Sequence, residues 1–197
     1  MTADTSTDKA GGMRVAFVVA NEGVEQVELE RPWEAVARAG GHPELIAPEA
    51  GEVQCFTHLD KGDRKPVDRT TADVRAEDYD MVVLPGGVAN PDQLRMDQAA
   101  LAFVRAMFEA GRPAAVICHG PWTLVEADLV RGRTLTSWPS LQTDIRNAGG
   151  TWKDEEVVVC TSGPNTLVTS RKPDDLPAFA REMVSALASR GERVGAR

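Results

Sequence analysis

Cys118 and His119 are the two residues of this sequence best placed to do chemistry. They follow residues 114–117, an apolar run that predicts a buried strand, and precede Gly120-Pro121, which predicts a helix start. A cysteine on such a turn projects from the carboxyl edge of a parallel sheet, where the next helix N-terminus favours a thiolate. The pattern predicts a nucleophilic Cys118; the alternative is a small, inert core cysteine.

Three acidic residues follow the first predicted strand, residues 13–20. The carboxyl ends of parallel strands meet at one edge of a sheet, so we expect Glu22, Glu25 and Glu28 near Cys118. Acids at a helix start are usually explained by the helix dipole. Glu25 is the candidate for a chemical role, on the condition that its side chain turns toward Cys118.

Paired glycines follow another predicted strand, residues 80–84. Gly86-Gly87 usually means a tight turn, but its unshielded N–H groups, with that of His119, could also hold an oxyanion. His119 is a candidate base if the turn bends sharply or a carboxylate orients the ring. The sequence lacks a G-x-G-x-x-G loop, which weighs against a dinucleotide-binding protein.

Predicted strands and helices alternate along the chain. Continuous apolar runs predict buried strands, and apolar residues at helical spacing predict amphipathic helices. The alternation predicts one doubly wound α/β layer sandwich with a mainly parallel central sheet. Residues 49–76 are expected as a short hairpin or loop. The expected strands are 13–20, 44–47, 80–84 and 114–117, the main helices are 25–39, 97–110, 139–147 and 176–188, and antiparallel additions are expected at 151–152, 157–160 and 167–169.

Length and charge limit the class of protein. A chain of 197 residues suits one large domain, expected over 13–189 between a disordered leader (1–12) and a polar tail (190–197). The formal net charge of −8 argues against a general binder of nucleic acids or anionic membranes. No apolar run reaches the ~20 residues that span a bilayer, and no signal peptide is evident. We expect a cytoplasmic protein.

The other cysteines and histidines carry no motif. Three cysteines are too few, and odd in number, for a disulfide framework. Their spacing does not suit zinc, and we expect no metal or other cofactor. Cys55 and Cys160 lie in predicted strands and are expected to be packing residues. His42 and His58 are expected at the surface.

Six short segments together resemble the PfpI/ThiJ family. The resemblance runs in the family's order over roughly residues 13–189. It is closest to the PfpI branch, the class I amidotransferase-like intracellular peptidases and stress proteins. The segments are 21–29 (NEGVEQVEL), 83–87 (VLPGG), 117–121 (ICHGP), 136–139 (TSWP), 147–149 (NAG) and 168–171 (VTSR).

The resemblance implies a flavodoxin-like three-layer fold, assembly into dimers or hexamers built from dimers, and a set of site residues. It implies Cys118 as the nucleophile, His119 as its neighbour, and the N–H groups of Gly87 and His119 as oxyanion donors. The family's inward-facing glutamate maps to Glu25 if this turn has one extra residue. The acid supplied across a subunit interface maps to Asp92, one methylene shorter than the family's Glu.

The resemblance also implies a cysteine hydrolase active in stress defence. Activities in this family include peptide hydrolysis, conversion of glyoxal and methylglyoxal, and repair of their early adducts with amines and thiols. One mechanism can serve all three, with a thiolate attacking a carbonyl carbon. A non-enzymatic redox sensor or holdase using Cys118 is the alternative. An amidotransferase or isonitrile-hydratase-like enzyme is a weaker third possibility.

Overall fold

The computed structural model describes the backbone of residues 10–195 and the side chains of residues 10–192. Seven strands form the central sheet: β1 (Arg14–Val18), β3 (His42–Ala47), β6 (Arg69–Thr70), β7 (Met81–Leu84), β8 (Ala114–Ile117), β11 (Val157–Cys160) and β12 (Leu167–Ser170). Their order is β11-β12-β8-β7-β1-β3-β6. Every pair is parallel except β11 with β12. The predicted α/β fold with a mainly parallel central sheet is confirmed.

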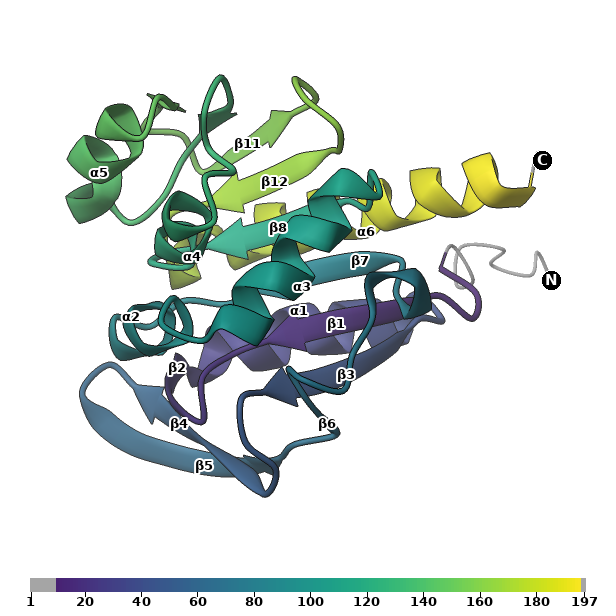
Figure 1. The fold of residues 1–197 in the computed structure, drawn as a ribbon, viewed down its shortest axis with the longest axis vertical. Helices are drawn as coiled ribbons and strands as arrows, with labels where there is room; N and C mark the ends of the chain where they lie inside the picture. The colour runs from purple at the N-terminus through teal and green to yellow at the C-terminus, as the bar shows by residue number, and fades with distance from the viewer. Residues whose placement is uncertain (1–9, 196–197) are drawn as a thin grey trace, which may run out of the picture.

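Helices cover both faces of this sheet, which makes the three layers (Figure 1). One face carries α1 (Gln26–Arg38) and α6 (Leu176–Gly195), and the other carries α3 (Gln98–Glu109). The shorter helices are α2 (Ala89–Leu94), α4 (Pro121–Glu126) and α5 (Gln142–Asn147), with single 3₁₀ turns at Ala76–Asp78, Pro139–Leu141 and Pro173–Asp175.

The core has two halves because successive strand residues face opposite sides of the sheet. On β1, Val15 and Phe17 belong to the half covered by α1 and α6. Ala16 and Val18 belong to the half covered by α3. Both halves are apolar, which explains why the parallel strands read as continuous apolar runs.

Two small sheets flank the central one. β2 (Glu22–Glu25) pairs in parallel with β4 (Glu52–Thr57), which forms an antiparallel hairpin with β5 (Asp60–Pro66). The expected hairpin in 49–76 is therefore present, and it also extends the strand that precedes α1. The second small sheet pairs β9 (Thr134–Leu135) in parallel with β10 (Thr151–Trp152). Of the expected antiparallel additions, β11 is antiparallel to β12. In contrast, β10 pairs in parallel with β9, and β12 pairs in parallel with β8.

The expected leader and tail lie partly outside the described residues. Ala10 is buried, and its N–H donates to the Ala39 carbonyl oxygen at 2.9 Å, so residues 10–12 pack on the domain. Helix α6 continues to Gly195, where a polar tail was expected from residue 190. In the described part of the chain, no helix is long and apolar enough to cross a membrane.

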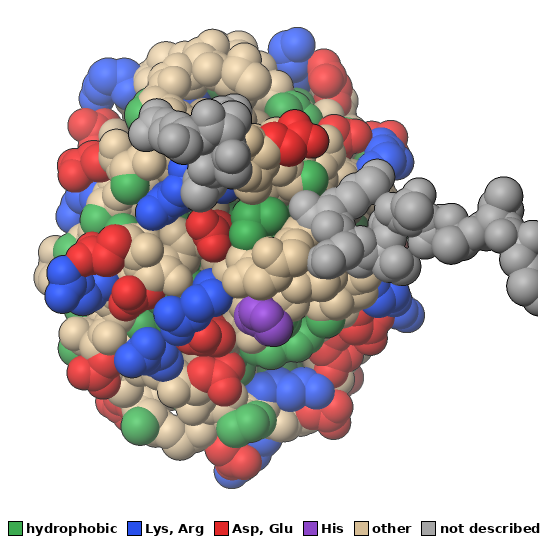
Figure 2. Space-filling view, turned by 90° about the vertical axis from the view of Figure 1, so that its right-hand side faces the viewer, with side chains coloured by type: hydrophobic (Ala, Val, Ile, Leu, Met, Phe, Trp, Pro, Cys, Tyr) green, Lys and Arg blue, Asp and Glu red, His purple; other side chains and the backbone are tan. Residues whose placement is uncertain are grey.

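The carboxyl ends of the parallel strands point to one end of the molecule, where α2 and α4 begin (Figure 1). At the opposite end, from which β1 starts, acidic and basic side chains are interspersed rather than gathered by sign (Figure 2). The segments that carry the candidate site residues therefore meet at the end where α2 and α4 begin, as expected for a parallel sheet.

Candidate active site

Cys118 lies on a strained turn directly after β8. Its φ is +61°, in the left-handed region that non-glycine residues rarely adopt. Two hydrogen bonds hold this backbone: the Cys118 N–H donates to the Ser170 carbonyl oxygen at 3.0 Å, and the Trp138 N–H donates to the Cys118 carbonyl oxygen at 2.8 Å. The geometry matches a nucleophile elbow at a sheet edge. Cys118 is 6% exposed.

Glu28, rather than Glu25, is the acid placed beside Cys118. The Glu28 side chain is fully buried, and its Oε2 accepts a hydrogen bond of 2.8 Å from the Gly86 N–H. The Glu28 carboxyl also lies close enough to Cys118 to raise the pKa of its thiol. The predicted inward position of Glu25, which assumed one extra residue in the turn, is not what the structure shows.

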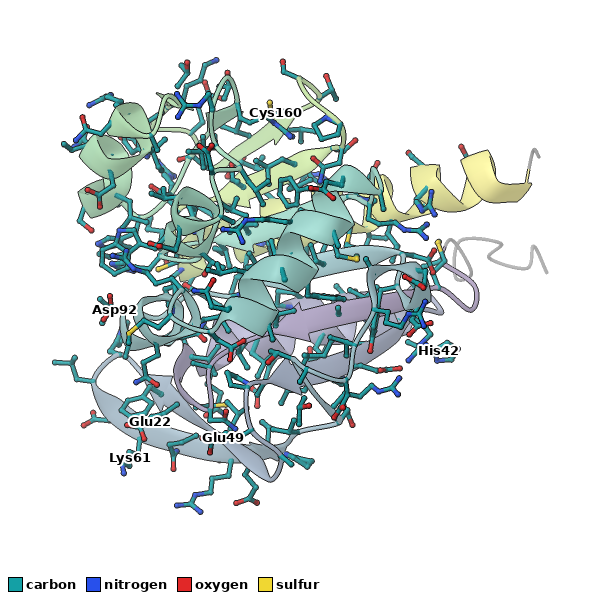
Figure 3. All side chains as sticks on the ribbon, viewed as in Figure 1. Glu22, His42, Glu49, Lys61, Asp92 and Cys160 are labelled. Atoms are coloured by element: carbon teal, nitrogen blue, oxygen red, sulfur yellow. The ribbon has the colours of Figure 1, made fainter. Side chains whose placement is uncertain are left out.

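Glu25 is occupied elsewhere because it ends β2 instead of beginning the inner face of α1. Its Oε2 accepts a hydrogen bond of 3.0 Å from the His58 N–H in the β4–β5 turn. The buried residues of α1 include Glu28, Pro32 and Val36. This i, i+4, i+8 spacing was the sequence signal that could have identified Glu28. Glu22 is exposed on β2 (Figure 3).

Burial controls the protonation of Glu28. Burial is the main reason that the pKa of the carboxyl is raised to about 8. The hydrogen bond from the Gly86 N–H lowers this pKa, and the charge of Glu25 raises it further. Glu28 therefore holds its proton at neutral pH. A neutral carboxyl can donate a hydrogen bond, whereas a carboxylate only accepts.

The Cys118 thiol is subject to opposing effects. Burial raises its pKa, and a charged Glu28 raises it further, while the N–H groups of Gly87 and His119 lower it. The expectation that the helix N-terminus sets the thiolate is therefore incomplete, because desolvation opposes it. Two adjacent like charges are unfavourable, so Cys118 and Glu28 together carry at most one negative charge near neutral pH. The net shift of the Cys118 pKa is upward, so the thiol also holds its proton near neutral pH and must give it up to react.

His119 is the second polar neighbour of the sulfur. Its Nδ1 is 3.3 Å from Cys118 Sγ. Burial lowers the pKa of the imidazole to about 4, so the ring is neutral at pH 7 and can accept a proton. The ring sits between two indoles, stacked on Trp138 at 5.7 Å and tilted against Trp122 at 5.3 Å between ring centroids.

The glycine pair allows these segments to approach. A Cβ on Gly86 would lie 2.5 Å from Glu28 Oε2 and 2.6 Å from Cys118 Cβ. Gly87 has φ +82° and packs against the backbone of β2. The N–H groups of Gly87 and His119 lie near Cys118 and lower the pKa of its thiol. The three expected segments therefore converge, and the role of these N–H groups as oxyanion donors stays a prediction.

Asp92 is separate from this cluster within the protomer. It lies on α2, with its side chain 65% exposed, and its Oδ1 is 3.9 Å from Arg95 Nε (Figure 3). It lines a surface pocket with Trp122 and Asp144 rather than the space around the elbow. Its expected role across a subunit interface stays a prediction.

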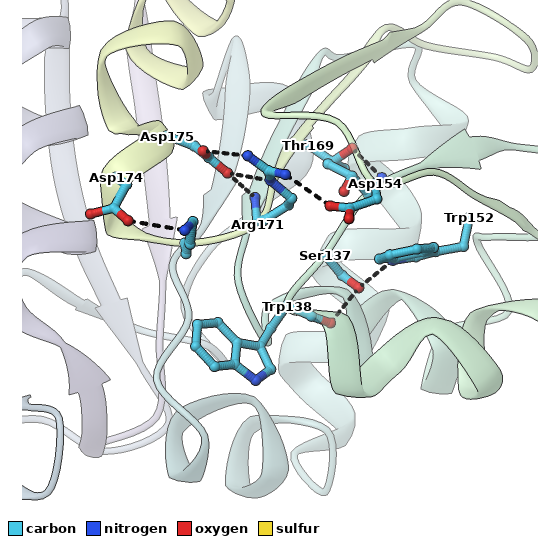
Figure 4. Close-up of polar contacts among 10 residues, drawn as sticks. Ser137, Trp138, Trp152, Asp154, Thr169, Arg171, Asp174 and Asp175 are labelled. Atoms are coloured by element: carbon cyan, nitrogen blue, oxygen red, sulfur yellow. Dashed lines mark hydrogen bonds and ion pairs between the residues drawn. The ribbon is translucent and has the colours of Figure 1, made fainter.

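A polar network that sequence reasoning missed positions the wall beside His119 (Figure 4). Trp152 Nε1 donates to Ser137 Oγ at 2.9 Å, and Ser137 Oγ donates to the Trp138 carbonyl oxygen at 2.9 Å. The Arg171 guanidinium binds Asp175 and, at 2.8 Å, Asp154. The Trp152–Ser137 bond fixes the loop that carries Trp138, and the Arg171–Asp154 pair joins two further segments that are 17 residues apart.

A pocket of about 530 Å³ opens next to the elbow. Trp138, which stacks on His119, forms part of its wall. Glu25, His58, Lys172 and Pro173 line the remainder. Among the described residues, no cluster of three or more His, Cys, Asp or Glu could hold a metal ion. Cys118 and His119 do not line this pocket, and Trp138 is the residue that connects it to the elbow.

The fold and the elbow define a class: α/β proteins with a cysteine on a strained turn at the carboxyl edge of a parallel sheet. The chain belongs to the DJ-1/PfpI family, whose model matches residues 13–186. It is 41% identical over 175 residues to "Deglycase PH1704" of Pyrococcus horikoshii, covering 89% of this chain and 99% of that protein. It is 38% identical over 174 residues to "Putative cysteine protease YraA" of Bacillus subtilis, covering 88% and 98%.

A solved structure agrees with this assignment. The crystal structure of Drosophila melanogaster DJ-1beta superimposes with a TM-score of 0.78 at 26% identity, over 93% of this chain and 95% of that one. The resemblance to the PfpI/ThiJ family noted from short motifs is thereby confirmed over the whole domain.

Proposed function

We propose that this protein is a cysteine-dependent hydrolase that acts on glyoxal- or methylglyoxal-derived adducts or on small peptides in stress defence. One observation carries the proposal: Cys118, on a strained elbow, has as neighbours a carboxyl that keeps its proton (Glu28) and a neutral imidazole (His119). The names of the relatives, a deglycase and a putative cysteine protease, support the same chemistry.

The proposed reaction begins at the sulfur. Cys118 Sγ attacks a carbonyl carbon, the carbonyl electron pair moves to oxygen, and the N–H groups of Gly87 and His119 bind that oxygen. If the thiol still holds its proton, His119 Nδ1 accepts it. Glu28 keeps its own proton and donates a hydrogen bond toward sulfur, which limits the charge on the pair.

The outcome then depends on the substrate. With an aldehyde, addition gives a hemithioacetal. With an amide, the tetrahedral adduct expels the amine, which takes the proton from His119, and water hydrolyses the thioester that remains. The pocket of about 530 Å³ suits a small adduct or a short peptide rather than a folded protein segment.

Assembly is part of the proposal. A homodimer, or a hexamer built from dimers, would bring Asp92 of one subunit toward His119 of another. Asp92 is free to serve in this way, because its side chain is exposed and its ion pair with Arg95 is long, at 3.9 Å. Exposed pairs of this kind contribute little stability, so breaking it costs little.

A substrate panel tests the proposal. The purified protein and Cys118→Ala are compared on methylglyoxal, a methylglyoxal-treated peptide and an aminoacyl-coumarin peptide. We expect turnover of at least one substrate by the parent protein and none by Cys118→Ala. Equal turnover by both proteins would remove Cys118 from the reaction.

A redox sensor is the second candidate, and a specific observation favours it. Glu28 Oε1 is buried and has no hydrogen-bond partner. An oxygen added to Cys118 would provide one, and a protonated carboxyl beside it would stabilise a sulfinate. Peptide mapping after mild peroxide treatment separates the two candidates. Two oxygens on Cys118, with no turnover of any substrate in the panel, would favour the sensor.

A further inference from the structure

Arg133 is a buried guanidinium with no carboxylate partner. It is 4% exposed and lies just before β9. It takes part in none of the ion pairs closer than 4.0 Å found in the described part of the chain. Leaving a charge buried without a counter-charge is costly. An arginine side chain stays positively charged in proteins, so it cannot avoid this cost by losing a proton.

Neutral oxygen atoms satisfy part of this guanidinium. Nη1 donates to Asn165 Oδ1 at 2.9 Å, and Nη2 donates to the Asn165 and Cys160 carbonyl oxygens at 2.9 Å and 3.2 Å. Nε is buried and has no partner. Gly163, with φ +103°, closes over the group, since a Cβ there would lie 2.9 Å from Arg133 Nη1. The site is built around the cation.

Cys160 lies next to the same cation, because its carbonyl oxygen accepts from Arg133 Nη2 and its sulfur accepts from the residue that follows Arg133. It is 5% exposed at the end of β11, and the Thr134 N–H donates to its sulfur at 3.4 Å. The two groups that hydrogen-bond the sulfur are uncharged: the Thr134 N–H and the Ser162 carbonyl oxygen, which is 3.9 Å away. Burial raises the pKa of Cys160, but the Thr134 N–H and Arg133 outweigh it, and the net shift is downward.

We propose that Cys160 is the counter-ion of Arg133 and a second modifiable thiol, oxidised by small uncharged oxidants such as hydrogen peroxide. The site is independent of the elbow. Cys160 pairs with Leu167, which pairs with Ala114 at the start of β8, whereas Cys118 follows the end of β8. Figure 3 shows Cys160 well away from Asp92. Cys160 is packed in the core as expected, and the proposal adds a chemical role to that packing.

The step is an ordinary thiolate oxidation. A sulfur electron pair attacks one peroxide oxygen, the O–O bond breaks, and hydroxide leaves and takes a proton from solvent to form water. The sulfur becomes a sulfenic acid and the peroxide is reduced. The Thr134 N–H and the Arg133 guanidinium are placed to bind the added oxygen. Limited exposure restricts the oxidant to about the size of water.

Cys55 is the internal control. It is also buried, but burial raises its pKa to about 11. In full-length Cys118→Ser protein, hydrogen peroxide is added with dimedone at neutral pH, and each cysteine is followed by peptide mapping. We expect Cys160 to be labelled roughly tenfold or more faster than Cys55. Equal labelling of the two cysteines, or none at Cys160, would overturn the proposal.

Two variants in the same background test the cation. Arg133→Met removes the charge and should slow labelling of Cys160 by roughly tenfold or more, whereas Arg133→Lys should stay within about threefold. An unchanged rate in Arg133→Met contradicts the pairing. If Arg133→Met does not fold, the pH dependence of the Cys160 labelling rate in the Cys118→Ser protein, which keeps Arg133, decides. A rate that levels off below about pH 8 supports a paired thiolate, and one that still rises above about pH 9 refutes it.

Discussion

Glu28 Oε2 accepts a hydrogen bond of 2.8 Å from the Gly86 N–H, and this bond ties α1 to the turn after β7. The contact is close because residue 86 is a glycine: a Cβ there would overlap both Glu28 and Cys118. It orients a buried carboxyl toward sulfur while leaving its second oxygen without a partner. The protonation of this carboxyl therefore links stability and reactivity at the elbow.

The first prediction concerns stability and pH. The pKa of Glu28 is raised from 4.5 to about 8, so the folded protein binds this proton more tightly than the unfolded chain. The stabilisation is fully present below the unfolded pKa and is lost as pH rises through about 8. Glu28→Gln keeps a neutral side chain at every pH. Between about pH 5 and pH 9, the parent should lose on the order of 4 kcal/mol relative to this variant.

Thermal midpoints of both proteins across this range give the measurement. The titration of His119 is common to both, so it cancels in the comparison. Glu25→Gln is the matched control, because the Glu25 carboxyl binds the His58 N–H and its charge is the smallest of the causes that shift the pKa of Glu28, so this variant should follow the parent closely. Parallel curves for the parent and Glu28→Gln would show that Glu28 does not hold its proton.

The second prediction tests the close approach at Gly86. Gly86→Ala places a Cβ 2.5 Å from Glu28 Oε2 and 2.6 Å from Cys118 Cβ, so the elbow or α1 must shift. Such overpacking costs about 1–3 kcal/mol, and we expect turnover to fall by roughly tenfold or more because the site loses its alignment. Thermal unfolding and kcat report the two effects.

Gly132→Ala is the control for a glycine replaced where there is space. Gly132 has φ +70° but nothing within 4 Å of an added Cβ. It should lose about 1 kcal/mol from backbone strain and keep its activity. If Gly86→Ala kept full activity, the tight packing of the elbow would not matter for chemistry.

Much of this fold follows from local sequence pattern. Apolar runs such as 81–84 and 114–117 are buried on both faces, and the elbow follows because Gly120-Pro121 begins a helix directly after a strand. The prediction that Glu25 turns toward Cys118 fails for a physical reason. Glu25 ends a strand that pairs with β4, and the first buried residue of α1 is Glu28.

Long-range contacts account for what the sequence did not reveal. The parallel pairing of β2 with β4 depends on a hairpin far along the chain. The Arg171 network joins residues in a loop and a helix start, and the environment of Cys160 depends on Arg133, 27 residues away. Neither the Arg171 network nor the pairing of Cys160 with Arg133 has a local sequence motif. Desolvation, which sets the protonation of Glu28 and His119, likewise depends on the packed structure.

The third prediction concerns Trp138. Its indole stacks on His119 and keeps water from the ring, and burial is what lowers the pKa of His119 to about 4. In Trp138→Ala, the pKa of His119 should rise toward its ordinary value of 6.5, as followed by NMR titration of the imidazole. Stability should change by about 1 kcal/mol or less, because Trp138 is 39% exposed.

His42 and His58 provide internal references in the same spectra, since neither ring is stacked in this pair of indoles. A His119 pKa that stays near 4 in Trp138→Ala would mean that other neighbours cause the desolvation. The same variant should also raise KM more than it lowers kcat, because Trp138 lines the pocket beside the elbow.

The fourth prediction tests the cross-subunit acid. If Asp92 of one subunit orients His119 of another, Asp92→Ala should lower kcat by roughly tenfold or more. The thermal midpoint should barely change, because the side chain is exposed and its pair with Arg95 is weak. Asp92→Glu restores the acid and should recover most of the rate. An unaffected rate in Asp92→Ala would show that His119 works without it.

The most direct test of the central claim is one assay of methylglyoxal consumption by the parent, Cys118→Ala, Glu28→Gln and Glu25→Gln. If Cys118 is the nucleophile and Glu28 its partner, Cys118→Ala should be inactive and Glu28→Gln should lose roughly tenfold or more, while Glu25→Gln stays within about twofold. Full consumption by Cys118→Ala, or a greater loss in Glu25→Gln than in Glu28→Gln, would contradict it.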